Sequence, residues 1–194
     1  MSDALAPGPD GRSRCWWGVS TPEYVEYHDR EWGRPEHDAR ALYEKVCLEA
    51  FQSGLSWITI LRKREHFRAA FAGFDPSVVA GYGEQDVERL MADAGIVRNR
   101  AKILATITNA RAALDVDLSA LMWSFAPEAR PRPRSRADVP PVTQESKALA
   151  KALKRHGFVF VGPTTAYAAM QACGLVDDHL AGCLVKATRG SASS

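Results

Sequence analysis

KALKRHGFVFVGPTTAYAAMQACG, residues 151–174, is the stretch from which the fold can best be argued. It predicts a helix, a short glycine-bearing turn, and a second helix that begins near Pro163. The strand-like run 158–162 has no partner run, so we interpret it as a hairpin between helices. A turn that enters a helix N-terminus offers unpaired N–H groups to a phosphate. An ordinary helix–helix corner has the same pattern, so this segment alone leaves both interpretations open.

The flanking sequence predicts further helices. Asp38 caps an apolar-striped segment that Gly54 can end in a left-handed cap, and Thr143 caps a segment that stops at Gly157. No internal repeat is visible, and the fold class is all-α. Other helical patterns cover residues 74–82, 84–95 and 99–117.

The composition is that of one globular domain, or of two small lobes with a shared core. The chain has 194 residues, of which 46% are hydrophobic and 25% charged. No apolar run approaches the roughly 20 residues that cross a bilayer, and the N-terminus has no secretory signal pattern. We therefore expect a cytoplasmic protein without membrane contact. The sequence does not encode the oligomeric state, and we expect a monomer. The net charge of +2 argues against nonspecific coating of nucleic acid but permits a local basic face.

Three stretches rich in Pro, Gly, Ser, Ala or Arg lie at the two ends of the chain and between its helical segments. We expect the tails 1–14 and 186–194 to be disordered. The Pro/Arg-rich loop 126–142 carries four arginines, and its prolines forbid a continuous helix. The resulting organisation is a single domain over residues 15–185.

Aromatic residues gather in sequence around one acidic residue, Glu49. Glu49 lies mid-helix among apolar residues, where an unpaired carboxylate is costly. Ring faces attract positive charge and a carboxylate accepts hydrogen bonds, so this group suits a flat cationic ligand. The alternative is a set of core aromatics with a solvated glutamate. The aromatic residues are Trp16, Trp17, Tyr24, Tyr27, Trp32 and Trp57.

Two cysteines and two histidines near the chain ends form a candidate metal site. Cys15 and His28 lie near one end, and His179 and Cys183 near the other, with a spacing that predicts one face of a helical turn. Two thiolates and two imidazoles make a closed tetrahedral zinc site of the structural type. Such a site would constrain a very long loop. The alternative is four unrelated residues.

The hairpin resembles that of the helix-hairpin-helix DNA glycosylases. Their motif resembles L-P-G-V-G-x-K-T-A, and residues 158–166 here are F-V-F-V-G-P-T-T-A. Phe160 replaces the first glycine. Thr164 stands where bifunctional members carry a lysine nucleophile, which implies base excision without strand cleavage. Asp177 falls on the superfamily aspartate in a string that resembles V-D-T-H.

Longer strings resemble the 3-methyladenine DNA glycosylase I (Tag) family, from about Cys15 to Cys183. They are GLSWITIL, DAGIVRNRAKI, KRHGFVFVG and MQACGLVDDH. The resemblance implies a two-lobed all-α helix-hairpin-helix glycosylase fold, with a structural Zn²⁺ joining the N- and C-terminal segments. The implied zinc ligands are Cys15, His28, His179 and Cys183; the implied pocket residues are Tyr24, Tyr27, Trp32, Glu49 and Trp57, with Glu49 catalytic; the implied DNA-contacting residues are Gly54, Leu55, Gly162, Thr164 and Thr165.

The implied activity is hydrolytic excision of 3-methyladenine from double-stranded alkylated DNA, which leaves an abasic site. The base must leave the stack to be reached, and its methylation supplies the positive charge that the pocket suits. We expect Trp57 and Tyr27 to stack on the base and Glu49 to accept from its amino edge. Gly54 and Leu55 would fill the gap in the duplex.

Three alternative functions have to be weighed against this one. A DNA-binding module would use the hairpin alone and leaves Glu49 unexplained. A metal-dependent hydrolase would need an open coordination position at the zinc. A glycosylase for another base, such as 3-methylguanine, would share every motif. Arg98, Arg100 and Lys102 either contact phosphate or lie on a solvated helix face.

Overall fold

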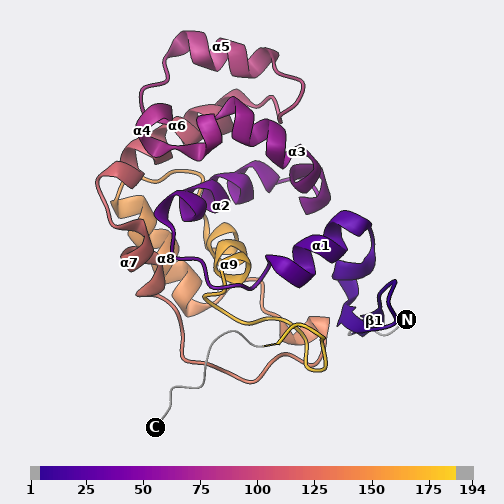
Figure 1. The fold of residues 1–194 in the computed structure, drawn as a ribbon. Coiled ribbons are helices and arrows are strands. Elements are labelled where there is room, and N and C mark those ends of the chain that lie inside the picture. Colours follow the sequence, from indigo (N-terminus) through magenta and orange to yellow (C-terminus); the bar gives the residue numbers. More distant parts are fainter. Residues whose placement is uncertain (1–4, 187–194) are drawn as a thin grey trace.

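The computed structural model describes residues 5–186 and is mostly helical, which confirms the predicted class (Figure 1). Helix α2 lies at the centre, and α3, α6, α7 and α9 pack against it. One continuous hydrophobic core joins the helices on its two sides. The elements of the described part are β1 (Leu5–Pro7), β2 (Ser13–Cys15), the 3-10 helix η1 (Trp16–Val19), α1 (Pro22–Arg30), α2 (Ala39–Gln52), α3 (Trp57–Ala70), η2 (Ala72–Phe74), α4 (Pro76–Val79), α5 (Glu84–Ala92), α6 (Arg100–Leu114), α7 (Leu118–Trp123), η3 (Arg136–Asp138), α8 (Gln144–Arg155) and α9 (Pro163–Ala172).

The N-terminal segment differs from the expected disordered tail. Strands β1 and β2 pair antiparallel, with Leu5 opposite Cys15. The buried Arg14 donates hydrogen bonds to the carboxylates of Asp10 and Asp29, which anchors the segment to α1. Composition alone pointed to disorder because these tertiary ion pairs join residues that are not adjacent in sequence. Residues 1–4 and 187–194 of the predicted tails lie outside the described residues.

The predicted helix ends are confirmed. The Asp38 side chain accepts from the backbone N–H of Ala41 at the start of α2, and Thr143 caps α8 through Ser146. Gly54 and Gly157 follow α2 and α8 with φ of 82° and 90°. Left-handed glycines end helices without a Cβ clash.

Residues 157–162 form the predicted turn between α8 and α9 and are not in a strand. Phe160, on the glycine position of the motif, adopts a φ of 57°, so it takes the left-handed conformation that a glycine would favour. The buried Asn109 of α6 supports the turn: its amide donates to the Val159 carbonyl and accepts from the Val159 N–H. A long-range amide clamp therefore stabilises a backbone conformation that phenylalanine rarely adopts.

The Pro/Arg-rich loop packs along the C-terminal segment. Arg132 donates to the Asp177 carboxylate and the Val185 carbonyl, and the Ala181 N–H donates to the Pro133 carbonyl. The loop contains the short helix η3. Its arginines thus serve in part as internal ion-pair partners.

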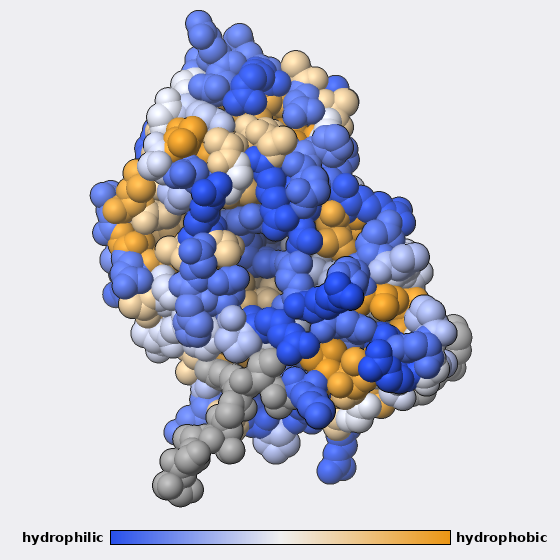
Figure 2. Space-filling view, viewed as in Figure 1, coloured by the Kyte–Doolittle hydropathy of each residue, from blue (hydrophilic) through white to orange (hydrophobic). Residues whose placement is uncertain are grey.

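The face shown in Figure 2 is mainly hydrophilic, and its apolar residues form small separate groups. Within residues 5–186, no helix combines the length and apolar character that a bilayer span requires.

Candidate functional site

A pocket of about 340 Å³ opens between α1, α2, α3 and α9. The structure brings together all five residues expected in the base pocket. The lining residues are Trp16, Trp17, Tyr24, Tyr27, Trp32, Glu49, Gln52, Trp57, Val139, Ala168, Gln171 and Asp178.

Glu49 is the buried carboxylate of this pocket. The exposed fraction of Glu49 is 6%, and burial raises the pKa of its carboxyl group to about 7. Among the described residues, no hydrogen-bond donor reaches the carboxylate within bonding geometry. A buried acceptor with its bonding capacity open is positioned to bind a ligand.

Lys45, one turn before Glu49 on α2, is a member of the site that sequence reasoning missed. Its ammonium lies 5.1 Å from the ring centroid of Tyr27 and 5.5 Å from that of Trp57. It donates to the Glu31 carboxylate at 2.8 Å, and its charge lowers the pKa of Glu49. The only sequence signal was the spacing of four residues between Lys45 and Glu49.

The aromatic side chains pack against one another in edge-on and tilted pairs. Trp17 lies edge-on to Tyr24 and Trp32, with centroid separations of 5.7 and 4.9 Å. Tyr27 and Trp57 are tilted by 42° at 5.5 Å. The indole N–H of Trp57 is buried without a hydrogen-bond partner among the described residues. Mutual packing fixes the ring orientations before any ligand binds.

The opposite wall of the pocket was not predicted from the sequence. Ala168 and Gln171, three residues apart on α9, line the pocket, as does Val139 from the Pro/Arg-rich loop. The α9 pair could have been found from its helical spacing. Val139 carries no pattern, because only the packing of the loop brings it to the pocket.

The two adjacent aspartates have different surroundings. Asp177, which matches the superfamily aspartate, accepts from Arg132 and from the backbone N–H of His179, and it is not among the pocket-lining residues. Asp178 lines the pocket, with a fully buried side chain. The residue in direct contact with the pocket is therefore the neighbour of the one that the motif indicated.

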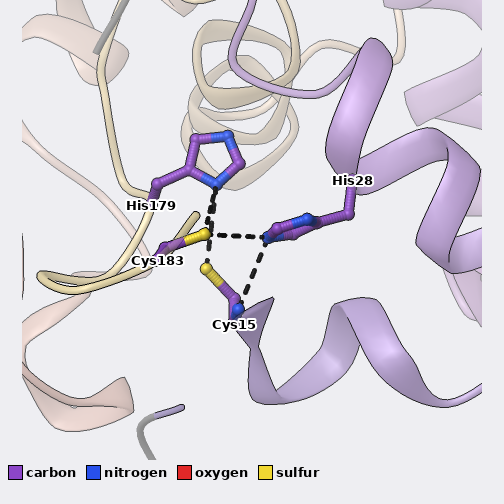
Figure 3. Close-up of side chains that lie close together, drawn as sticks. All are labelled: Cys15, His28, His179 and Cys183. Carbon is purple, nitrogen blue, oxygen red and sulfur yellow. Dashed lines mark hydrogen bonds between the residues drawn. The ribbon is translucent and has the colours of Figure 1, made fainter. Parts of the chain in front are cut away.

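The four predicted metal ligands meet in space (Figure 3). Their ligand atoms all lie within 4.8 Å of one another. Cys183 Sγ is 3.5 Å from His28 Nε2 and 3.7 Å from His179 Nδ1, and Cys15 Sγ is 3.8 Å from His179 Nδ1. Sulfur and nitrogen ligands of a tetrahedral zinc ion lie about 3.6 Å apart, given bonds of about 2.3 and 2.0 Å. The group has the spacing to hold a metal ion.

The outer sides of the two imidazoles are also fixed. His28 Nδ1 lies 2.8 Å from Asp29 Oδ1, and His179 Nε2 lies 3.0 Å from the Trp32 carbonyl. These acceptors favour protons on the outer nitrogens, which leaves His28 Nε2 and His179 Nδ1 unprotonated and facing the cysteine sulfurs. His179 and Cys183 lie on an irregular turn, so the expected helical turn between them is wrong.

The loop after α2 carries Gly54 and the exposed Leu55. Lys102 of α6 is buried and donates to the carbonyls of Phe51 and Ser53. It therefore holds this loop in place, and the expectation of a solvated or phosphate-contacting Lys102 is wrong. The sequence missed this contact because it joins segments about fifty residues apart.

The residues expected to contact DNA at the hairpin occupy the start of α9. Gly162 is the N-cap residue without a capping side chain, Thr164 is exposed and Thr165 is half-buried. A groove beside them is lined mainly by cations. Its residues are Lys147, Ala150, Lys151, Lys154, Arg155 and Pro163.

An aromatic pocket around a buried carboxylate, together with a basic groove at the N-terminus of α9, is the combination expected of a helical protein that binds an extruded nucleic-acid base. The family model described as methyladenine glycosylase matches residues 17–187. The chain belongs to this family.

Relatives with established names support the assignment. The chain is 51% identical to DNA-3-methyladenine glycosylase 1 of Escherichia coli (strain K12), over 88% of this chain and 95% of that protein. It is 48% identical to the DNA-3-methyladenine glycosylase of Haemophilus influenzae (strain ATCC 51907 / DSM 11121 / KW20 / Rd), over 90% and 98%. A solved variant of 3-methyladenine DNA glycosylase I in complex with 3-methyladenine superposes with a TM-score of 0.84 at 35% identity, covering 88% and 96% of the two chains.

Proposed function

We propose that this chain is a DNA-3-methyladenine glycosylase that hydrolyses the N-glycosidic bond of 3-methyladenine in double-stranded DNA. The observation that carries the proposal is the buried Glu49 carboxylate, which receives no hydrogen bond from the described residues and is surrounded by aromatic rings. Methylation at N3 places positive charge on adenine. A desolvated carboxylate and ring faces bind that charge better than they bind a neutral base.

The roles of the pocket residues follow from this chemistry. Tyr27 and Trp57 stack on the extruded base, and Glu49 accepts a hydrogen bond from its amino edge. The cationic base is a good leaving group, so its departure needs no strong general acid. Water then captures the sugar cation, which leaves an abasic site.

The DNA-facing elements position the substrate. The N–H groups at the start of α9 and the neighbouring lysines bind phosphates of the backbone. Leu55, held by the loop that Lys102 supports, fills the space vacated by the base. Thr164 has no amine with which to form a Schiff base, so the abasic product is released without strand cleavage. We propose that the protein acts as a monomer.

We further propose that the Cys–His cluster, defined as Cys15, His28, His179 and Cys183, holds a structural Zn²⁺ ion. Four protein ligands close the coordination sphere, so the ion would supply cross-linking of the terminal segments and no reactive water. His28 follows Tyr27 on α1, so the cluster also fixes the helix that carries a stacking residue.

The decisive experiment incubates the purified protein with DNA methylated by dimethyl sulfate and resolves the released bases by chromatography. We expect release of 3-methyladenine, retention of 7-methylguanine, and intact strands on a denaturing gel. If folded, metal-replete protein releases no methylated base, the chain is a DNA-binding module and the pocket residues are core residues.

A further inference from the structure

The wall of the pocket opposite α2 contains a buried polar network centred on Asp178. Its side chain is fully buried, and both carboxylate oxygens accept hydrogen bonds. Oδ1 accepts from Arg130 at 2.8 Å, and Oδ2 accepts from the Tyr167 hydroxyl at 2.6 Å and from Gln171 Nε2 at 2.9 Å. The network therefore joins the Pro/Arg-rich loop, α9 and the pocket wall.

This network fixes the orientation of the Gln171 amide. A carboxylate only accepts hydrogen bonds, so the NH₂ end of the amide must face Asp178. The carbonyl oxygen is then the free end of the amide. No donor among the described residues bonds to that oxygen, and Gln171 lines the pocket together with Glu49. The pocket thus offers two acceptors, one from α2 and one from α9.

Adenine and guanine differ in the polarity of the group at C6. Adenine carries an amino donor there, and guanine carries a carbonyl acceptor. An acceptor in the pocket wall can bond to the first and repels the second. A buried acceptor that faces another acceptor is left without a donor, which disfavours that base by roughly tenfold to a hundredfold.

We infer that Gln171 determines base specificity: its side-chain carbonyl, oriented by Asp178, accepts a hydrogen bond from the amino group of the methylated adenine and disfavours methylated guanine. This inference rests on the proposed function and assigns a further specificity residue to the same pocket. Asp178 and Arg130 are positioning residues, because they act on the base through the Gln171 amide.

The inference also gives a role to the Pro/Arg-rich loop. Arg130 is the loop residue that pairs with Asp178, and its side chain is partly exposed at 42%. Arg130 donates to Asp178 Oδ1 and to the Tyr167 hydroxyl, so its charge balances the buried carboxylate that Tyr167 and Gln171 share. An asparagine at position 178 could donate as well as accept, so the Gln171 amide could rotate and present its NH₂ to the pocket.

The test measures release of 3-methyladenine and 3-methylguanine from the same dimethyl sulfate-treated DNA under single-turnover conditions. The variants are Gln171→Leu, Gln171→Met and Asp178→Asn. Asp177→Asn is the matched control, since that carboxylate pairs with Arg132 and does not line the pocket. Thermal melting verifies that each variant folds, and the methionine variant preserves side-chain length if leucine disturbs α9.

We expect both Gln171 variants to lower the rate of 3-methyladenine release by roughly 10- to 100-fold and to lower the ratio of 3-methyladenine to 3-methylguanine released. Asp178→Asn lowers the same ratio, whereas Asp177→Asn preserves it. An unchanged ratio in the folded Gln171 variants overturns the specificity role while the proposed function stands. An unchanged ratio in Asp178→Asn overturns the positioning role. Wild-type protein that releases neither base overturns both the proposed function and this inference.

Discussion

The Cys–His cluster and the base pocket are neighbouring regions that differ in whether their buried polar groups have hydrogen-bond partners. Adjacent residues on α1 serve them: Tyr27 lines the pocket and His28 joins the cluster. In the cluster, each imidazole has a partner on its outer nitrogen and faces ligand atoms on the other. In the pocket, Glu49 is buried without a hydrogen-bond donor from the described residues. Buried polar groups that bond to other protein groups stabilise the fold. A buried acceptor without a protein donor is expected where a ligand supplies the missing hydrogen bond.

The two regions also contact each other through rings. The ring centroids of His179 and Trp32 lie 4.8 Å apart, and those of His28 and Trp17 lie 5.2 Å apart; both pairs are edge-on. Both tryptophans line the pocket. A change that loosens the cluster should therefore act on the pocket through position, and a change in the pocket should leave metal binding intact.

The largest effect is expected at Glu49. Glu49→Ala should lower the single-turnover rate of 3-methyladenine release by about 10²–10³, the usual cost of removing one preorganised electrostatic group. Affinity for DNA with an abasic site should stay near the wild-type value. Glu44→Ala is the control, because Glu44 lies on the same helix and pairs with Arg68. Equal losses of excision and abasic-site binding would contradict the role of Glu49.

Loss of the metal should affect the free energy of unfolding more than the rate of base excision. Cys15→Ala should abolish stoichiometric zinc in elemental analysis. If zinc is present at about 1,000 times its Kd, this variant loses about 4 kcal/mol of unfolding free energy. The melting temperature then falls by about 8–16 °C. Cys47→Ala, which removes a buried thiol outside the cluster, should keep the metal. Full zinc content in Cys15→Ala would show that the cluster is not the site.

The same experiment separates a structural from a catalytic metal. Chelated protein, assayed at a temperature where it remains folded, should still excise 3-methyladenine, at a reduced rate because Trp17 and Trp32 lose the support of the cluster. Complete loss of activity in folded, metal-free protein would instead favour the metal-dependent hydrolase.

Activity should depend on pH through Glu49. Burial raises the pKa of this carboxyl group from 4.5 to about 7 in the folded protein. The ionised form is the one that attracts a cationic base, so kcat/KM should fall about tenfold per pH unit below about pH 7. Glu49→Gln should be less active and lack this dependence. A wild-type profile that stays flat from about pH 5 to about pH 8 would contradict the assignment.

The same shift has a defined sign for stability. The folded state holds the Glu49 proton more tightly than the unfolded state, so the contribution of this group to unfolding free energy decreases as the pH rises from 4.5 to about 7. The total change is about 3 kcal/mol, given about 1.4 kcal/mol for each pKa unit. Denaturant titrations of the wild type and of Glu49→Gln over this pH range measure it, and parallel curves for the two proteins would contradict the shift.

The smallest effect is expected at Lys45. Its ammonium lowers the pKa of Glu49, so Lys45→Met should shift the pH profile of kcat/KM to higher pH. Activity at pH 7 should drop severalfold and recover in more alkaline buffer. Arg64→Met is the matched control, since Arg64 pairs with the same Glu31 but is absent from the pocket lining. Identical profiles for Lys45→Met and wild type would exclude this electrostatic coupling.

The helical class, the helix ends, the hairpin and most of the pocket residues could be predicted from the sequence. Caps and glycines act locally, which is why Asp38, Thr143, Gly54 and Gly157 could be assigned from their neighbours in the chain. The pocket could be predicted because an acidic residue stands among apolar and aromatic residues in the sequence. The four cluster residues could be predicted because cysteines and histidines are typical zinc ligands.

Features that depend on contacts between distant segments could not be predicted from the sequence and were found only in the tertiary structure. Arg14 anchors the N-terminal hairpin to α1 by pairing with Asp29, and the left-handed Phe160 lies in a turn that Asn109 clamps. Lys102 holds the loop after α2. The position of Asp178, rather than Asp177, in the pocket wall also depended on packing. A side chain's partner is set by chain geometry across long separations, and no local pattern encodes it.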